Sequence, residues 1–208
     1  MAYGFLDIAI TPSVRAAQAA MGSADAWTDF KGHREFDRFT ENEAAFIAER
    51  DSFYMASVSE TGWPYVQYRG GPRGFLKQID DQTLGFADFR GNRQYLTVGN
   101  VTADNRVSLI LMDYPGRARL KILGRVEVKP LDEDPDLTGR LVVSGYKARP
   151  ERLMLVRLEA FDWNCPQHIV PRFTEQEVAE AIAPLRERLD AVESENARLR
   201  ARLAGTGL

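Results

Sequence analysis

The chain has 208 residues, of which 44% are hydrophobic, and it carries a formal net charge of -3 with an isoelectric point near 5.5. This size suits one folded core with an added element, and the charge offers no general attraction to nucleic acid or anionic lipid. No run of about 18 apolar residues indicates a membrane span, and no signal peptide is indicated, so we expect a cytoplasmic protein. The single cysteine, Cys165, excludes an internal disulfide, and no paired Cys and His spacing indicates a metal site.

Two helices are predicted near the N-terminus. The dipeptide Thr11-Pro12 is typical of an N-cap followed by proline at the first helical position, and this helix should end at Gly22. A second helix should begin at Thr40 and Glu43, which fit a capping box before an apolar face. We therefore expect residues 1–50 to form a helical segment that packs on the main domain.

Short runs of alternating apolar and polar residues predict the strands of that domain, residues 51–173. The expected strands are Phe53–Val58, Trp63–Arg69, Phe75–Ile79, Thr83–Phe89, Arg106–Met112, Ala118–Lys129 and Leu153–Leu158. A turn at residues 59–62 should join the first two as a hairpin. Because few helices separate the strands, the sequence predicts a mainly β (α+β) fold, a six- or seven-stranded antiparallel barrel that is closed or partly closed.

A loop rich in basic and amide side chains lies between two of these strands, where residues 90–94 read RGNRQ. We expect Asn92 to be the N-cap of a short helix, with Arg93 in its first turn. A helix start fed by a glycine-containing loop offers backbone N–H groups and a cation at one point, which is typical of a phosphate site. The alternative is that Arg90 and Arg93 are ordinary solvated charges.

A second basic cluster flanks a break in the strands at Gly70-Gly71-Pro72. Its members are Arg69, Arg73 and Lys77. Glycine permits a close backbone approach and proline fixes the bend, so cations gather where a strand is interrupted. The segment lacks the Gly-Lys-Ser/Thr ending of a P-loop, and no GxGxxG motif indicates a Rossmann dinucleotide site.

These segments, in this order, resemble the flavin-binding split barrel of the pyridoxamine 5'-phosphate oxidase family. The resemblance rests on FADF, RGNRQ, NRVSLILMD and RARLKILGRVEV, and it spans about Phe53 to Phe173. The segments YVQYRGGPRGFL and WNCPQHIVPRF are most similar to those of its flavin-nucleotide-binding subgroup. The resemblance implies FMN at the interface of a homodimer, with the phosphate on basic side chains and the ring against barrel strands.

The resemblance, together with the basic clusters, gives a set of candidate cofactor-binding residues. They are Gln67, Arg69, Arg73, Lys77, Asn92, Arg93, Gln94, Arg119, Trp163 and Gln167. The resemblance places Arg93, Gln94 and Lys77 at the phosphate and Arg119 at the flavin ring. Gln94 and Arg119 replace the lysine and glutamine of the family, although both remain hydrogen-bond donors.

Two positions of the family pattern stay open. Arg69 and Arg73 are both candidates for the arginine that opens the first family motif, because the glycine break shifts the alignment. The segment LTGRLVVSGYKARPERLM stands where the family carries its substrate-phosphate residues. We therefore do not expect the pyridoxamine phosphate reaction.

An irregular segment, Phe161–Phe173, gathers the sole cysteine, a tryptophan and a histidine. One interpretation places Trp163, Gln167 and His168 beside the flavin ring, with His168 as a proton donor and tentative catalytic residue. The alternative is that Trp163 and Cys165 fill the core and His168 caps a hydrogen-bond network.

Residues 174–208 carry a heptad pattern that predicts a C-terminal helix, and the coiled coil within it should begin near Pro184. The seam after Val178 consists of Ile182, Leu185, Leu189, Val192, Asn196, Leu199 and Leu203. The opposite charges that would pair across a parallel dimer are Arg188 with Glu193 and Glu195 with Arg200. Asn196 would fix the register of such a dimer. The alternative is a single amphipathic helix that packs on its own barrel.

Three functional interpretations follow from these features. The first is an FMN-dependent oxidoreductase that acts on an unidentified small molecule. The second is a non-catalytic flavin- or haem-binding protein of the same fold, with His168 as a possible axial ligand. The third is a coiled-coil interaction module with an empty barrel, which leaves the basic clusters unexplained.

Overall fold

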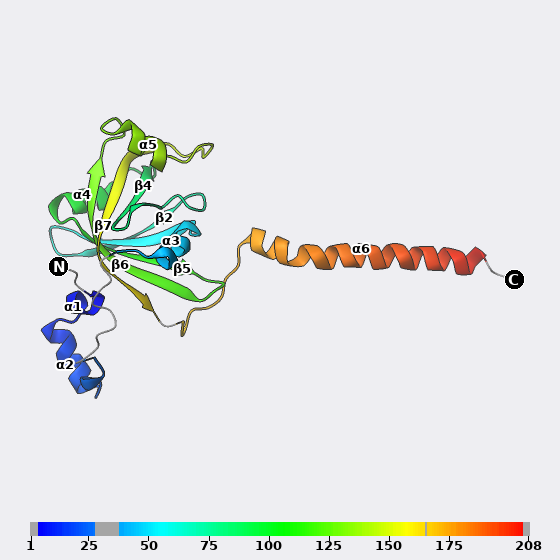
Figure 1. The fold of residues 1–208 in the computed structure, drawn as a ribbon, viewed down its shortest axis with the longest axis horizontal. Coiled ribbons are helices and arrows are strands. Elements are labelled where there is room, and N and C mark those ends of the chain that lie inside the picture. Colours follow the sequence, from blue (N-terminus) through cyan, green and yellow to red (C-terminus); the bar gives the residue numbers. More distant parts are fainter. Residues whose placement is uncertain (1–3, 28–37, 165, 206–208) are drawn as a thin grey trace. The chain divides into compact units, whose positions relative to one another are not determined.

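The computed structural model describes residues 4–27, 38–164 and 166–205. Its helices are α1 (Phe5–Ala9), α2 (Pro12–Ala20), the 3-10 helix η1 (Asp25–Trp27), α3 (Glu41–Ala48), α4 (Leu96–Ala103), α5 (Pro135–Leu141) and α6 (Glu175–Gly205). Its strands are β1 (Ser52–Val58), β2 (Pro64–Gly70), β3 (Lys77–Asp80), β4 (Thr83–Phe89), β5 (Arg106–Asp113), β6 (Ala118–Lys129) and β7 (Pro150–Asn164). Figure 1 shows the strands curling around a common interior, and it shows α6 as one long helix.

The seven strands form one antiparallel sheet in the order β2-β1-β5-β6-β7-β4-β3. β2 and β3 are the two edges, and within the described residues no pairing joins them, so the sheet curls without closing. β6 and β7 pair along most of their length, with one shift of register between Leu123 and Gly124. This arrangement is an open split barrel, and the predicted mainly β (α+β) class is confirmed.

Alternate side chains of the strands fill the inside of the barrel. On β1, Phe53 and Met55 are buried, whereas Tyr54 between them is partly exposed on the other face. The Phe53 ring stacks on Phe75 with centroids 5.7 Å apart and meets Phe86 edge to face at 5.3 Å. Burying each such side chain contributes about 1.5–3 kcal/mol. These contacts hold β4 and the loop before β3 against β1.

Most of the predicted element boundaries are confirmed. β4 and β6 have the predicted ends, and β1 and β2 form the predicted hairpin. α2 follows Thr11, whose hydroxyl accepts a hydrogen bond from the Val14 N–H at 3.4 Å. α3 follows the predicted capping box, in which the Glu43 carboxylate accepts from the Thr40 N–H at 2.9 Å and from the Thr40 hydroxyl at 2.5 Å.

Two strand predictions are wrong at their ends by more than one residue. β3 begins at Lys77 rather than Phe75, because Phe75 and Leu76 turn into the core and are buried there. β7 extends beyond Leu153–Leu158 at both ends, because it pairs with β4 on one side and with β6 on the other. α1 and α5 were not predicted; α5 has a readable signal, since the Asp134 side chain caps it by accepting from the Leu137 N–H at 2.9 Å.

The chain divides into two compact units, one of residues 1–113 and 117–168 and one of residues 114–116 and 169–208. The second unit contains α6, which starts at a capping box: the Thr174 N–H donates to the Glu177 carboxylate at 2.7 Å, and the Glu177 N–H donates to the Thr174 hydroxyl at 3.2 Å. The helix begins at Glu175, close to the predicted boundary at residue 174, and Pro184 lies inside it rather than in its first turn. Among the described residues, no helix combines the length and apolarity that crossing a membrane requires.

Candidate functional site

Two adjoining hollows meet on β2 and β4 of the barrel. The larger, here called the aromatic cleft, has a volume of about 530 Å³. It is lined by Asp51, Gln67, Tyr68, Arg69, Gly70, Gly71, Phe75, Phe86, Ala87, Asp88, Phe89, Arg90, Gly91, Tyr146 and Ala148. The smaller, the loop hollow, has a volume of about 50 Å³ and is lined by Tyr65, Gln67, Arg69, Asp88, Phe89, Gly91, Asn92, Arg93, Gln94, Tyr95, Leu96, Thr97, Val98 and Glu151.

The side chains shared by both hollows come from facing positions on β2 and β4. Gln67 and Arg69 are two residues apart on β2 and therefore lie on the same side of the strand. The Arg69 guanidinium forms an ion pair with the carboxylate of Asp88 on β4. The Arg69 side chain is only 11% exposed and that of Asp88 only 6%, so this pair forms a buried polar floor between the hollows.

One polar atom of this floor is left without a partner. The Nε of Arg69 is buried and, in the part of the chain that the structure describes, no hydrogen-bond acceptor meets it. A buried donor without an acceptor costs about 1–3 kcal/mol. The site therefore has one donor available for an acceptor atom of a bound molecule.

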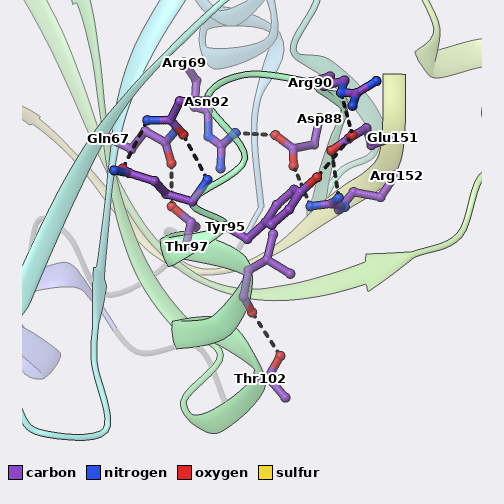
Figure 2. A network of polar contacts seen from close by, with 12 residues as sticks. Gln67, Arg69, Asp88, Arg90, Asn92, Tyr95, Thr97, Thr102, Glu151 and Arg152 are labelled. Carbon is purple, nitrogen blue, oxygen red and sulfur yellow. Dashed lines mark hydrogen bonds and ion pairs between the residues drawn. The ribbon is translucent and has the colours of Figure 1, made fainter. Parts of the chain in front are cut away.

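Asp88 belongs to a wider network of charges, which Figure 2 shows across β4 and β7. Arg152 on β7 also pairs with Asp88 at 3.4 Å and with the Glu151 carboxylate at 3.0 Å. Glu151 in turn meets the Arg90 guanidinium at 3.6 Å and accepts from the Tyr95 hydroxyl at 3.2 Å. Opposite charges thus alternate through this network, of which Asp88 and Glu151 line the loop hollow.

Burial controls the titration of Asp88. Removal from water raises the pKa of its carboxyl, and the nearby Glu151 carboxylate acts in the same direction. The positive charges of Arg69 and Arg152 and the hydrogen bond from Arg69 lower the pKa, but only in part, so the pKa stays above its ordinary value of 3.8. Asp88 is therefore easier to protonate than a carboxyl on the surface.

The loop between β4 and α4 corrects the predicted helix start. Asn92 accepts a hydrogen bond from the Gln94 N–H at 3.1 Å and donates its own amide to the Gln94 side chain at 3.1 Å. This local turn competes with helix formation, so α4 begins at Leu96 with Tyr95 as its N-cap. Asn92 is not the N-cap, and Arg93 is not in the first turn: both precede the helix, and Arg93 has a left-handed φ of 65°.

The loop nevertheless brings donors to one place, as the sequence indicates. Leu96, Thr97 and Val98 line the loop hollow at the start of α4, and the first N–H groups of a helix have no acceptor within it. The first helical hydrogen bond of α4 runs from the Gly99 N–H to the Tyr95 carbonyl at 2.9 Å. Arg93 lines the same hollow and is exposed. Such a combination of helix N-terminus and cation suits an anionic group.

Gln67 fixes this loop to the sheet. Its side-chain oxygen accepts a hydrogen bond from the Thr97 hydroxyl at 2.8 Å, and Thr97 is buried (Figure 2). The bond connects β2 directly to the first turn of α4.

The structure thus brings together five of the predicted cofactor residues. They are Gln67, Arg69, Asn92, Arg93 and Gln94.

Two predicted phosphate ligands lie outside these hollows. Arg73 forms an exposed ion pair with Glu49 at 2.9 Å, so of the two arginines left open it is Arg69 that lines the site. Lys77 donates its Nζ to the Arg140 carbonyl at 2.6 Å beside α5. The loop before β3 causes this separation, because it turns Phe75 inward and carries Arg73 outward.

The remaining predicted residues are spread over the chain. The Trp163 indole donates to the Glu43 carboxylate at 2.6 Å and packs edge to face on Phe46 of α3, as in the core-filling alternative. Arg119 has a buried Nε for which the described residues supply no acceptor, but it lines neither hollow. Gln167 and His168 are exposed, and His168 has a φ of 63°. Cys165 lies outside the described residues.

Sequence reasoning missed several residues of the site. Asp88 is buried in the site, the half-buried Glu151 and Arg152 form its charge network, and Tyr146 meets Phe89 edge to face at 5.0 Å in the aromatic cleft. A signal for Asp88 exists: an acidic residue inside the apolar strand TLGFADF must be paired if it is buried. Its partners come from β2 and β7, and sequence alone does not reveal those contacts.

Comparison with known proteins gives a family match over more than half of the chain. The profile described as pyridoxamine 5'-phosphate oxidase matches residues 39–161. No curated protein matches.

Several solved structures are similar in outline. HupZ of Group A Streptococcus is 14% identical, with a TM-score of 0.47 over 65% of this chain and 99% of that chain. An FMN-binding protein from Syntrophomonas wolfei is 14% identical, with a TM-score of 0.44 over 74% of this chain and 95% of that chain. General Stress Protein 26 from Bacillus anthracis is 12% identical, with a TM-score of 0.45 over 64% and 95%.

Proposed function

Because this chain belongs to the pyridoxamine 5'-phosphate oxidase family, we propose that it is a flavoprotein that binds FMN in the two hollows. The phosphate would occupy the loop hollow beside Arg93 and the start of α4, and the flavin ring would occupy the aromatic cleft. The observation that carries this proposal is the shared floor of Arg69 and Asp88, which joins a donor-rich hollow to an aromatic one.

The residues present fit such a ligand. A phosphate needs several donors, and the loop hollow offers the Arg93 guanidinium, the Gln94 amide and the first N–H groups of α4. A planar ring needs an apolar surface with a few polar groups, and the aromatic cleft combines Phe86 and Phe89 with the unpartnered Nε of Arg69. Its volume of about 530 Å³ lies within the range that is usual for cofactor sites.

FMN supplies hydride and single-electron chemistry when it is bound, and the protein supplies orientation and electrostatics. In this chain, Arg93 would neutralise the phosphate, and the phenyl rings of Phe86 and Phe89 would exclude water from the flavin ring. Asp88 lies at the boundary of both hollows, and its raised pKa makes it a carboxyl that holds a proton more readily than a surface aspartate. We therefore favour an oxidoreductase acting on a small molecule, and not on pyridoxamine phosphate, because the family's substrate-phosphate segment is replaced here.

We also infer that two barrels associate around the cofactor. Tyr54, Val66, Tyr68 and Ile110 share the outer face of β2-β1-β5, as the register of these strands requires. Val66 and Tyr68 are 60% and 59% exposed, and Tyr68 also lines the aromatic cleft. An exposed apolar face of this kind suits a second copy of the barrel, which would then cover the open side of the cleft.

The visible absorption spectrum of the purified protein tests the cofactor. We expect the two bands of oxidised flavin, and we expect chromatography of the heat-released chromophore to identify FMN. A haem Soret band would instead support the haem-binding interpretation. A colourless protein that stays colourless after FMN is added would contradict the proposal.

A further inference from the structure

We propose that α6 forms a parallel, in-register, two-stranded coiled coil with the α6 helix of a second copy of this chain. This contact is separate from the barrel and does not depend on a bound flavin. The proposal rests on the exposed seam of α6, on its charges and on Asn196.

The seam of α6 is apolar and exposed. The helix runs without a break from Glu175 to Gly205, and none of its residues is buried. From Leu185 onward its large apolar seam side chains are between 45% and 73% exposed, the lowest at Leu199 and the highest at Leu203, and Ile182 is half-buried. A helix gains most of its stability from packing an apolar face, so a seam of this length requires a partner.

Pro184 does not interrupt that seam. Counting heptads from Ile182 as an a position, Pro184 falls at c, on the outer side of a two-stranded coil. The capping box of Thr174 and Glu177 lies before it and stabilises the first turn. The helix thus presents three complete heptads from Ile182 to Leu203 without a proline at the contact.

The charges beside the seam suit a parallel partner in register. In that arrangement each g residue faces the e residue of the next heptad on the partner helix. Arg188 then faces Glu193 of the partner subunit, and Glu195 faces Arg200 of the partner subunit. Both pairs occur twice by symmetry, and all of them are attractive.

A fully overlapped antiparallel pair is disfavoured by the same charges. In antiparallel coils e faces e and g faces g, so Arg186 would meet Arg200 and Arg188 would meet Arg202. Glu193 would meet its own copy. Every contact of the overlap would join like charges, which raises the energy of the pair.

A shift of one heptad makes the antiparallel charges attractive, and Asn196 then decides between the two directions. In the shifted pair Asn196 would face Leu185 of the partner subunit, which leaves a buried amide without a hydrogen bond. In the parallel pair Asn196 faces its own copy, and the two amides can bond to each other. A single Asn at an a position is the usual device that fixes both register and a two-stranded state.

Cysteine cross-linking in the full-length protein tests the arrangement. In a background of Cys165→Ser, we expect Leu189→Cys, which leaves Asn196 in place, to form a disulfide-linked dimer on mild oxidation, because a positions face each other in a parallel coil. Ser194→Cys is the matched control at the outer f position and should cross-link several-fold less. Equal cross-linking at the two positions would overturn the proposal, and it is also the result expected if α6 packs on its own barrel.

Charge reversal tests the direction of the helices. Arg188→Glu should reduce the cross-linking of Leu189→Cys, and adding Glu193→Arg should restore it, because the parallel pair is rebuilt with its signs exchanged. In the shifted antiparallel pair the double reversal sets the introduced glutamate against Glu195 and the introduced arginine against Arg186, so like charges meet at both contacts. Cross-linking would then not recover, and parallel pairing would be excluded. The flavin absorbance of each variant, recorded in parallel, separates a failure of this proposal from a failure of the cofactor proposal.

Discussion

The indole N–H of Trp163 on β7 donates a hydrogen bond of 2.6 Å to the carboxylate of Glu43 on α3, 120 residues earlier in the chain. The same carboxylate accepts from the Thr40 N–H and hydroxyl, so one side chain both caps α3 and fastens it to the barrel. Glu43 is 4% exposed. Trp163 thus lies on a strand rather than in the predicted irregular segment, and its structural role accounts for it without a cofactor.

We predict that Trp163→Phe destabilises the fold while leaving flavin binding intact. The substitution keeps most of the ring packing on Phe46 but removes the donor to Glu43. Loss of a hydrogen bond to a buried charged group should lower the free energy of unfolding by about 1.5–3 kcal/mol. Urea denaturation measures this change. Trp63→Phe is the matched control, because Trp63 is 76% exposed, and an equal loss in both variants would contradict the assignment.

The pH dependence of stability should carry the signature of Glu43. Burial raises the pKa of this carboxyl, but the hydrogen bonds from Thr40 and Trp163 together outweigh burial and hold the pKa below its ordinary value of 4.5. A depressed pKa in the folded state means that the ionised form stabilises the protein above about pH 4.5 and that this contribution is lost as the pH falls through the folded pKa.

Glu43→Gln should therefore be less stable than the wild type at neutral pH, and the difference should shrink as the pH is lowered below about 4.5. Urea denaturation at a series of pH values measures the difference. A difference that stays constant over that range would show that the charge of Glu43 does not contribute.

The contrast between the confirmed and the missed features has a physical cause. Thr40 and Glu43, or Thr11 and Pro12, are neighbours on the chain, so local hydrogen-bond chemistry fixes the helix starts that they mark. The strand pattern likewise depends on alternation along a short run of residues. These features, and with them an antiparallel barrel, could be predicted from the sequence, and the resemblance to the family implied the split barrel.

The site could be predicted only in part, because its contacts join distant strands. Asn92 has the residue type of an N-cap, but its side chain instead forms a turn with Gln94, and the helix begins only at Leu96. Lys77 is separated from the cleft by a loop whose path depends on where Phe75 packs. Such outcomes are set by packing across the fold, which a single sequence does not reveal.

Gly124 should resist substitution because of the register shift between β6 and β7. A Cβ at this position would lie 2.6 Å from the Arg157 carbonyl oxygen and 2.8 Å from a methyl group of Val156. We predict that Gly124→Ala lowers the free energy of unfolding by about 1–3 kcal/mol through overpacking. Gly139→Ala on α5 is the control, since nothing lies within 4 Å of its added Cβ, and it should be neutral or slightly stabilising. Thermal unfolding distinguishes them, and an unperturbed Gly124→Ala variant would contradict the packing argument.

Removal of Arg69 should affect both stability and cofactor binding. Arg69→Met keeps an aliphatic side chain but leaves Asp88 with Arg152 as its remaining cationic partner, at 3.4 Å. Removal of one member of a buried ion pair can lower the free energy of unfolding by as much as about 3–5 kcal/mol. We expect a marked fall in the urea concentration at the midpoint of unfolding. We also expect the folded variant to bind FMN more weakly in the absence of urea. A variant with unchanged stability would show that the pair contributes nothing to the fold.

Arg93 should contribute to affinity alone. It is exposed, it lies in the loop hollow, and its guanidinium would bond the FMN phosphate. We predict that Arg93→Ala weakens FMN binding by about 1–3 kcal/mol, the usual loss for a charge-assisted hydrogen bond, without changing the unfolding free energy. Arg73→Ala removes an exposed arginine that pairs with Glu49 outside the site and should leave the affinity unchanged. Equal effects of the two substitutions would remove Arg93 from the phosphate site.

The most direct test of the account is a titration of flavin-free protein with FMN and, in a parallel experiment, with riboflavin. The quenching of flavin fluorescence measures the binding. We predict saturable binding of FMN, and binding of riboflavin at least about tenfold weaker, which corresponds to about 1.4 kcal/mol from the phosphate contacts. Equal affinity for the two ligands would contradict the phosphate assignment of the loop hollow, and no binding of either by folded protein would contradict the flavin site itself.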